Sequence, residues 1–293
     1  MGNTYAITGA TGNTGSAAAE ELINAGHTVR VIGRSKEKLE KFESAEIYEG
    51  DILDTEFLTN AFKGADAVYA LIPPKIDAED FREYANEVSD SIIKSVKNSG
   101  VKKVAALSSI GADLDKGTGV VLSLHDLEIK FKKLEGVDVL FLRAGYFMEN
   151  TLVQADMIKS TSTMGFPVKA DIKFPMVAAK DIGKTAAEKL KNLDFTGKEV
   201  HYVLGQEDVS YNQVAEVFGK EIGKEDLSYI QYPYDEFHRA MVGMGASQSV
   251  ATGYVGLAQA MNEEKINYER NEKTTTPTSI KDFAKTFAHV YKQ

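Results

Sequence analysis

A glycine-rich segment near the amino terminus has the residue types and the spacing that bind phosphate groups. The run Gly9-Ala10-Thr11-Gly12-Asn13-Thr14-Gly15 follows a β-rich stretch directly and leads into a helical pattern. Glycines in such a turn permit tight dihedrals and let the backbone approach a ligand, while the N–H groups and positive dipole of the helix start favour a pyrophosphate. Glycines are also frequent in ordinary turns. The position of this run between a first strand and a first helix favours a nucleotide site over an ordinary turn. We therefore predict a dinucleotide site that includes Gly9, Thr11, Gly12, Asn13, Thr14 and Gly15.

The second predicted strand ends in an arginine, where the ribose of the adenosine is expected. The segment reads Val29-Arg30-Val31-Ile32-Gly33-Arg34. An acidic residue at this place would accept hydrogen bonds from a free 2′-hydroxyl, whereas an arginine pairs with a 2′-phosphate. Arg34 therefore favours NADP(H) over NAD(H). The alternative is an ordinary surface arginine beside Lys36 and Lys38.

Two further strand ends are predicted to border the same dinucleotide. Gly50-Asp51-Ile52 follows the third strand, and Leu71-Ile72-Pro73-Pro74 closes the fourth. Because the carboxyl ends of parallel strands meet at the nucleotide crevice, we expect contacts from Asp51, Ile52, Leu71, Ile72 and Pro73. Asp51 would accept from the adenine amino group, and its alternative is a residue that begins a turn.

The residues available for proton transfer are few. A tyrosine followed four residues later by a lysine is the usual pair in short-chain dehydrogenases, and no tyrosine of this chain has a lysine at that spacing. The helix expected to carry that pair holds His125 and Lys130 instead. His125 would protonate a reduced acceptor because imidazole changes charge near neutral pH, and its alternative is a structural histidine. Lys130 is the weaker candidate, since Asp126 lies four residues before it and is predicted to form a helix ion pair with it.

These residues require a framework of alternating strands and helices. Strands are expected over Thr4–Thr8, Thr28–Gly33, Ala45–Tyr48, Ala67–Ile72, Lys103–Leu107 and Val137–Leu142. Amphipathic stretches such as Ser16–Ala25 and Phe81–Lys97 lie between them. This alternation predicts an α/β fold, a Rossmann-type doubly wound parallel sheet over residues 1–150.

Beyond residue 150 the regular alternation weakens, and residues 151–293 are expected to form a smaller α/β substrate lobe, with the chain free to cross back between lobes. Glu199–Leu204 and Leu227–Tyr232 are predicted strands of a local β-α-β unit whose helix begins with a capping box, Ser210 to Gln213. A cleft between the lobes is expected to hold a flat, apolar substrate. Its predicted lining is Phe166, Phe174, Met176, Tyr232, Tyr234, Phe237, Met241 and Met244.

Composition excludes several other functions. The chain has 293 residues and a formal net charge of −9, which is unlike a nucleic-acid-binding surface. It contains no cysteine, so disulfides and thiol nucleophiles are excluded, and its histidines show no metal-ligand spacing, so no metal is expected. No apolar run is long enough to span a membrane, and the amino end lacks the pattern of a signal peptide. A cytoplasmic protein is the expectation.

The chain resembles the NmrA-like family of atypical short-chain dehydrogenase/reductases. The resemblance is carried by the glycine loop, Arg34, Gly50-Asp51, Leu107-Ser108-Ser109 and the segment Arg143–Asn150, with Ala179-Lys180-Asp181-Ile182 further along. It implies an NADP-type Rossmann lobe followed by a small carboxy-terminal lobe. Members of the family include NADPH-dependent quinone reductases, triphenylmethane-dye reductases and regulators that bind the dinucleotide without obvious turnover.

Further site residues follow from the resemblance. It implies dinucleotide contacts from Gly145, Tyr146, Phe147 and Asn150, with Tyr146 close to the nicotinamide. It implies that Ser108 or Ser109 presents a strand-end hydroxyl beside the nicotinamide, the alternative being a plain turn. A basic residue near the cofactor corresponds to Lys180, whose alternative is a surface lysine at a helix start. We therefore take Ser108, His125, Lys130 and Tyr146 as the catalytic candidates.

The resulting hypothesis is an NADPH-dependent oxidoreductase that passes hydride to a flat electrophile such as a quinone, an azo compound or dye, or a conjugated carbonyl compound. Its partners are a small-molecule acceptor and at most a second copy of the chain, so a monomer or homodimer is expected. The alternative is an NADP(H)-sensing regulatory protein of the same family, without turnover.

Overall fold

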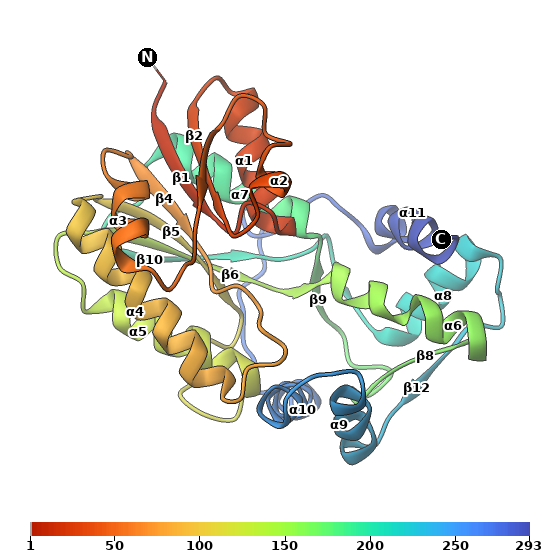
Figure 1. The fold of residues 1–293 in the computed structure, drawn as a ribbon. Helices are drawn as coiled ribbons and strands as arrows, with labels where there is room; N and C mark the ends of the chain where they lie inside the picture. The colour runs from red at the N-terminus through yellow and green to blue at the C-terminus, as the bar shows by residue number, and fades with distance from the viewer. Residues whose placement is uncertain (1) are drawn as a thin grey trace.

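The computed structural model describes residues 2–293, and its largest feature is a seven-stranded parallel sheet (Figure 1). The strand order is β10-β6-β5-β4-β1-β2-β3. The order runs in opposite directions from β1 and β4, so the carboxyl ends of these two neighbours form the switch point at which doubly wound sheets bind ligands. The strands are β1 (Thr4–Thr8), β2 (Thr28–Gly33), β3 (Glu46–Glu49), β4 (Ala67–Ala70), β5 (Lys103–Ser109), β6 (Asp138–Ala144) and β10 (Lys198–Val203).

Helices cover both faces of this sheet. On one face lie α1 (Asn13–Asn24) and α7 (Ala179–Asn192), and on the other lie α3 (Thr55–Phe62), α4 (Phe81–Ser99) and α5 (Leu122–Lys132). The short helix α2 (Lys36–Leu39) follows β2. Alternate residues of each strand point to opposite faces, so Tyr5 and Ile7 join the α1/α7 core while Ala6 joins the other. The predicted fold class is confirmed.

Local sequence signals set where the helices begin and end. Asp80 caps α4 by accepting a hydrogen bond from the backbone N–H of Glu83, and Gly100 ends it with a φ of 80°. The predicted capping box of Ser210 and Gln213 is present at the start of α8 (Tyr211–Ile222). The sequence therefore placed these boundaries correctly.

The remaining elements form a smaller lobe around an aromatic core, in which the Phe218 and Phe287 rings stack at 4.1 Å. Two small sheets, of order β11-β9-β7 and β12-β8, belong to it. Its elements besides α8 are β7 (Tyr146–Phe147), η2 (Met148–Gln154), α6 (Ala155–Thr161), β8 (Thr163–Phe166), β9 (Phe174–Val177), β11 (Asp208–Val209), β12 (Ser228–Gln231), α9 (Tyr234–Gly243), α10 (Gln248–Asn262) and α11 (Ile280–Tyr291). A 3-10 turn, η1 (Gly119–Val121), precedes α5 and contacts α10.

The predicted local β-α-β unit of the second lobe is wrong. The first of its strands, β10, pairs with β6 at the edge of the large sheet, whereas β12 pairs with β8 in the small lobe. The chain thus crosses back after β9, and α7 packs closely on α1: a Cβ on Gly183 would lie 2.5 Å from the carbonyl oxygen of Thr14. The residue pattern of a segment predicts that it is a strand but not which strand it pairs with. The two strands were therefore predicted to be neighbours only because they are close in the sequence.

Candidate functional site

A groove of about 600 Å³ opens at the carboxyl ends of the central strands of the large sheet. We call it the main groove. Elements of both lobes line it, including the glycine turn, the residues after β4, η1 and α10. The predicted cofactor residues that line it are Gly9, Thr11, Gly12, Asn13, Thr14, Arg34, Leu71, Ile72, Pro73, Gly145, Tyr146, Phe147 and Asn150. The structure therefore brings together in one concavity residues that are spread over most of the large lobe.

The glycine turn leaves the start of α1 open to an anion. Gly9 has a φ of +63°, and a Cβ on Gly15 would lie 2.4 Å from the Gly9 carbonyl oxygen, so the tight turn requires glycine at both places. Within residues 2–293, no side chain caps α1 at Gly12 and no acidic residue occupies its first turn. The N–H groups and the positive dipole of α1 therefore face the groove uncompensated, which fits a diphosphate.

Arg34 directly follows β2, and its side chain is available for a ligand. It is exposed and lines the groove, and among the described residues it forms no ion pair. Arg30 on the same strand differs, because its guanidinium binds Glu46 at 3.0 Å and donates to two backbone carbonyls. Unlike Arg30, the Arg34 guanidinium could therefore pair with an additional phosphate on the ribose.

Four of the predicted cofactor contacts, Gly15, Asp51, Ile52 and Lys180, lie outside the residues that line the main groove. Asp51 accepts a hydrogen bond from the backbone N–H of Leu53 at 2.9 Å, as in the turn considered as its alternative. Its neighbour Ile52 is half-buried and packs on the core of the α3/α4/α5 face. Lys180 lies exposed in the first turn of α7. Their contacts with a dinucleotide stay predictions.

His125 and Lys130 are not among the residues that line the main groove, and each has a partner elsewhere in the protein. The His125 Nδ1 atom lies 2.9 Å from the carbonyl oxygen of Ala112. Lys130 binds the Asp90 carboxylate at 2.8 Å and the backbone carbonyl of Asn86 at 3.0 Å. These contacts hold both side chains in place, and the transfer of a proton by His125 or Lys130 stays a prediction.

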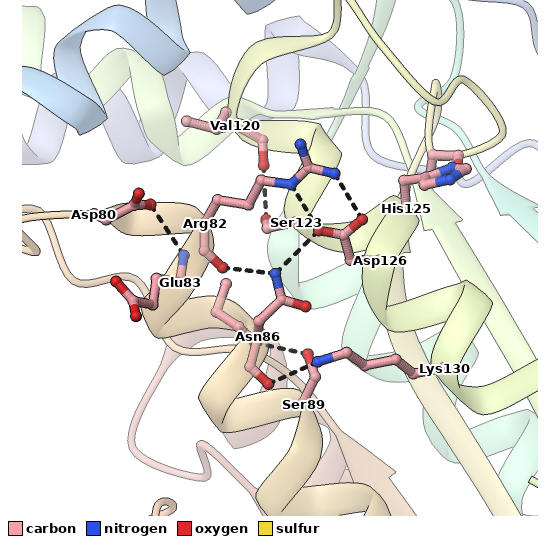
Figure 2. A network of polar contacts seen from close by, with 12 residues as sticks. Asp80, Arg82, Glu83, Asn86, Ser89, Val120, Ser123, His125, Asp126 and Lys130 are labelled. Carbon is pink, nitrogen blue, oxygen red and sulfur yellow. Dashed lines mark hydrogen bonds and ion pairs between the residues drawn. The ribbon is translucent and has the colours of Figure 1, made fainter.

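The predicted ion pair between Asp126 and Lys130 is also wrong. Asp126 instead receives two hydrogen bonds from Arg82 of α4, at 2.7 and 2.8 Å, and a third from Asn86 (Figure 2). These hydrogen bonds from Arg82 lower the pKa of Asp126. The neighbouring helix outcompetes the local pair because a bidentate guanidinium matches a carboxylate better than one ammonium does.

Ser108 lines the main groove from the end of β5, and its hydroxyl is bound from below by a buried ion pair. It donates to Glu128 of α5 at 2.7 Å, and Glu128 binds Arg143 of β6 through both carboxylate oxygens, at 2.9 and 2.7 Å. Burial raises the pKa of Glu128, but the hydrogen bonds from Arg143 and Ser108 outweigh it, so the net shift is downward. Sequence reasoning missed Glu128. The only available signal was an acidic residue on the predicted apolar side of α5.

A second pocket of about 390 Å³ adjoins the main groove and shares Ser109, Tyr146 and Leu257 with it. Its lining mixes apolar side chains with charged and polar ones. The other residues that line it are Ile110, Ile172, Lys173, Phe174, Met261, Glu264, Ile266, Asn267 and Tyr268. A ligand in the main groove and a molecule in this second pocket would therefore meet at the shared residues.

The predicted substrate cleft is only partly correct. Of its proposed lining residues only Phe174 lines the second pocket; Phe166 and Met176 are buried in the core, and Met244 is 75% exposed. The carboxy-terminal residues Leu257 to Tyr268 replace them. The sequence did not predict their position because they lie in and after α10, more than a hundred residues from the glycine turn, and no local pattern shows that α10 and this turn line the same groove.

Tyr146 is the aromatic side chain common to both concavities. Its ring meets Phe174 edge to face at a centroid distance of 5.8 Å and lies 6.0 Å from Phe166. Burial raises the pKa of Tyr146, so its phenol stays protonated at neutral pH. The side chain thus offers a flat ring and one neutral hydroxyl at the junction.

No metal centre or membrane segment emerges from the described chain. Residues 2–293 contain no cluster of three or more histidine or carboxylate side chains that could hold a metal ion. Over the same range, no helix combines the length and apolar character needed to cross a bilayer.

Comparison with known proteins confirms the resemblance noted in the sequence. The family model described as "NmrA-like family" matches residues 1–284. A curated relative, the NAD(P)H azoreductase of Xenophilus azovorans, is 25% identical over 259 residues, covering 88% of this chain and 84% of that protein. Among solved structures, the NADPH-dependent quinone oxidoreductase of Escherichia coli complexed with NADPH has a TM-score of 0.80 at 21% identity, covering 98% and 99% of the two chains. The negative transcriptional regulator NmrA in complex with NADP has a TM-score of 0.70 at 17% identity, covering 98% and 91%. The structural likenesses establish a shared fold.

Proposed function

The chain belongs to the NmrA-like family, and we propose from this membership and its site that it is an oxidoreductase that uses NADP(H) to reduce a flat, conjugated small molecule. One observation carries the proposal. The main groove, with its uncapped helix start and available Arg34, meets a second pocket, partly apolar, at Tyr146, Ser109 and Leu257. The relatives named as an azoreductase and a quinone oxidoreductase support it.

The chain offers a matching group for each part of NADP(H). The N–H groups at the start of α1 and the backbone of the glycine turn would hold the diphosphate, since Gly9 and Gly15 leave no side chain in the way. Arg34 would pair with the 2′-phosphate. When bound in its reduced form, the nicotinamide supplies a hydride, and the protein supplies position and a dry surrounding.

The second pocket would hold the acceptor. Ile110, Ile172 and Phe174 present apolar surface, and the ring of Tyr146 can stack on or flank a flat molecule. For a quinone the balance is quinone plus NADPH plus one proton giving hydroquinone plus NADP+. Because His125 and Lys130 are held elsewhere, we assign that proton to water. A quinone-type acceptor forms a comparatively stable anion on reduction, so it does not require a strong protein acid.

A second candidate function is a sensor of NADP(H) without turnover. It is favoured by one observation, the position of His125 and Lys130 away from the groove, and by the fold that the chain shares with the regulator NmrA. In such a protein, occupancy of the groove would change the contact with another protein. Both candidates predict NADPH binding, and they differ in turnover.

The deciding experiment measures NADPH binding first and acceptor-dependent NADPH oxidation second. The panel should contain quinones, azo dyes, triphenylmethane dyes and conjugated carbonyl compounds. Oxidation that depends on one of these acceptors supports the reductase. Firm NADPH binding without oxidation across the panel supports the sensor, and a lack of binding to either dinucleotide refutes both.

A further inference from the structure

The hydroxyl of Ser108 has a fixed direction because of the ion pair beneath it. Ser108 is 2% exposed, Glu128 is fully buried, and Arg143 faces Ser108 across the β5–β6 pair. The three side chains come from two strands and a helix, and they meet behind Ser108, the one of them that lines the main groove. A buried ion pair does not by itself show a contribution to stability. The Glu128–Arg143 pair, which also binds the groove residue Ser108, is therefore a candidate for a functional role.

Glu128 can only accept hydrogen bonds in this arrangement. Its Oε1 atom receives the hydroxyl of Ser108 at 2.7 Å and the Nε–H of Arg143 at 2.9 Å. Its Oε2 atom receives Nη2 of Arg143 at 2.7 Å and the ammonium of Lys132 at 3.2 Å. A carboxylate has about four lone-pair positions, and all of them face donors, so none is left for a proton.

The single proton of the Ser108 hydroxyl is therefore committed to Glu128. A serine hydroxyl has one hydrogen to donate and two lone pairs that accept. With the hydrogen directed down, only lone pairs remain toward the groove. Ser108 in this state recognises a donor group of a ligand and cannot hand a proton to one.

We infer that Glu128 is a positioning residue that holds Ser108 as a hydrogen-bond acceptor for a donor group on the nicotinamide half of NADP(H). This inference rests on the proposed function. The donor is either the carboxamide N–H or a ribose hydroxyl, which share the chemistry of a neutral N–H or O–H. Ser108, a catalytic candidate from the family resemblance, is thereby assigned a role in cofactor binding.

The test compares Ser108→Ala, Glu128→Gln and the double variant in the full-length protein. Loss of one hydrogen bond should weaken NADPH binding by about tenfold in Ser108→Ala. The double variant should bind no more weakly than the weaker single variant, because both changes remove the same contact. At saturating NADPH the solvent isotope effect on turnover should stay at its wild-type value, because the Ser108 hydroxyl transfers no proton.

The matched control is Ser89→Ala, which removes a serine that is equally buried and donates to the Ala85 carbonyl at 2.7 Å within α4, outside the groove. Its NADPH affinity should change by less than about twofold. Should Glu128→Gln fail to fold, the comparison of Ser108→Ala with this control still decides the question.

An NADPH analogue with 3-acetylpyridine in place of nicotinamide identifies the donor, because its acetyl group has no N–H. If wild type prefers NADPH over the analogue and Ser108→Ala does not, the donor is the carboxamide. If Ser108→Ala weakens both cofactors equally, the donor is a ribose hydroxyl. Unchanged NADPH affinity in Ser108→Ala, or a lowered kcat with an altered solvent isotope effect, overturns the inference. A wild-type protein that binds no NADPH would instead refute the proposed function.

Discussion

Replacing Arg34 by aspartate should invert the cofactor preference of this protein. Arg34 is exposed, lines the main groove and, among the residues the structure describes, has no carboxylate partner. The substitution removes a positive charge that would meet the 2′-phosphate and places a negative charge there. In NADH the same aspartate would instead accept hydrogen bonds from the free 2′-hydroxyl.

The size of the effect follows from the exposure of Arg34. A hydrogen bond to a charged group contributes about 1.5–3 kcal/mol, and solvent at an exposed site favours the lower half of that range. Repulsion between the new carboxylate and the phosphate adds about 1 kcal/mol at the effective dielectric of a protein surface. The sum of about 3 kcal/mol corresponds to a loss of roughly a hundredfold in NADPH affinity. NADH affinity should change by less than about threefold or improve.

The assay is a fluorescence titration of purified protein with NADPH and NADH at low and high salt. Lys38→Asp is the matched control, because it makes the same change in charge at an exposed residue of α2 outside the groove lining. The NADPH loss in Arg34→Asp should shrink as salt rises, since screening weakens an exposed pair. Equal losses for the two dinucleotides, or the same loss in Lys38→Asp, would refute the reasoning.

Three other predictions test separate parts of the site. Gly15→Ala should weaken NADPH binding by at least tenfold, because its Cβ would lie 2.4 Å from the Gly9 carbonyl oxygen; Gly243→Ala, with open space around it, is the control in the same titration. His125→Ala should lower the free energy of unfolding by about 1 kcal/mol but leave kcat within about twofold, and a large fall in kcat would return His125 to the reaction. The folded-state pKa of Glu128 lies below its ordinary value of 4.5, so the stability it contributes is present above about pH 4.5 and is lost as pH falls through the lower, folded value. Urea unfolding measured from neutral to acid pH should therefore show that the free energy of unfolding falls less steeply with falling pH in Glu128→Gln than in the wild type. Parallel plots of this free energy against pH for the two proteins would contradict this.

Much of the cofactor half of the site could be predicted because its signals are local. The turn from Gly9 to Gly15 needs glycine wherever the backbone is tight, and that requirement is visible in consecutive residues. Arg34 follows directly from the end of an apolar strand. Strand ends of a parallel sheet share one edge, so Leu71 could be assigned to the groove without coordinates, whereas Gly145 was assigned through the family resemblance.

The reacting half could not be predicted in the same way. Helical periodicity identified α5, but it did not say that His125 would turn to the Ala112 carbonyl or that Arg82 of another helix would take Asp126. Nor did it say that Glu128 would be buried with Arg143 and Ser108 as its partners.

The sequence by itself determined the order of strands and helices in the large lobe, the phosphate-binding turn and the cation beside it, because each depends on dihedral preference and patterning within a few residues. Tertiary structure alone decided that β10 returns to the edge of the large sheet, that α10 brings Leu257 to the main groove, and that Glu128 fixes the hydroxyl of Ser108. These outcomes depend on which distant surfaces meet. Such contacts are selected by the free energy of packing the whole chain, which no short stretch of residues encodes.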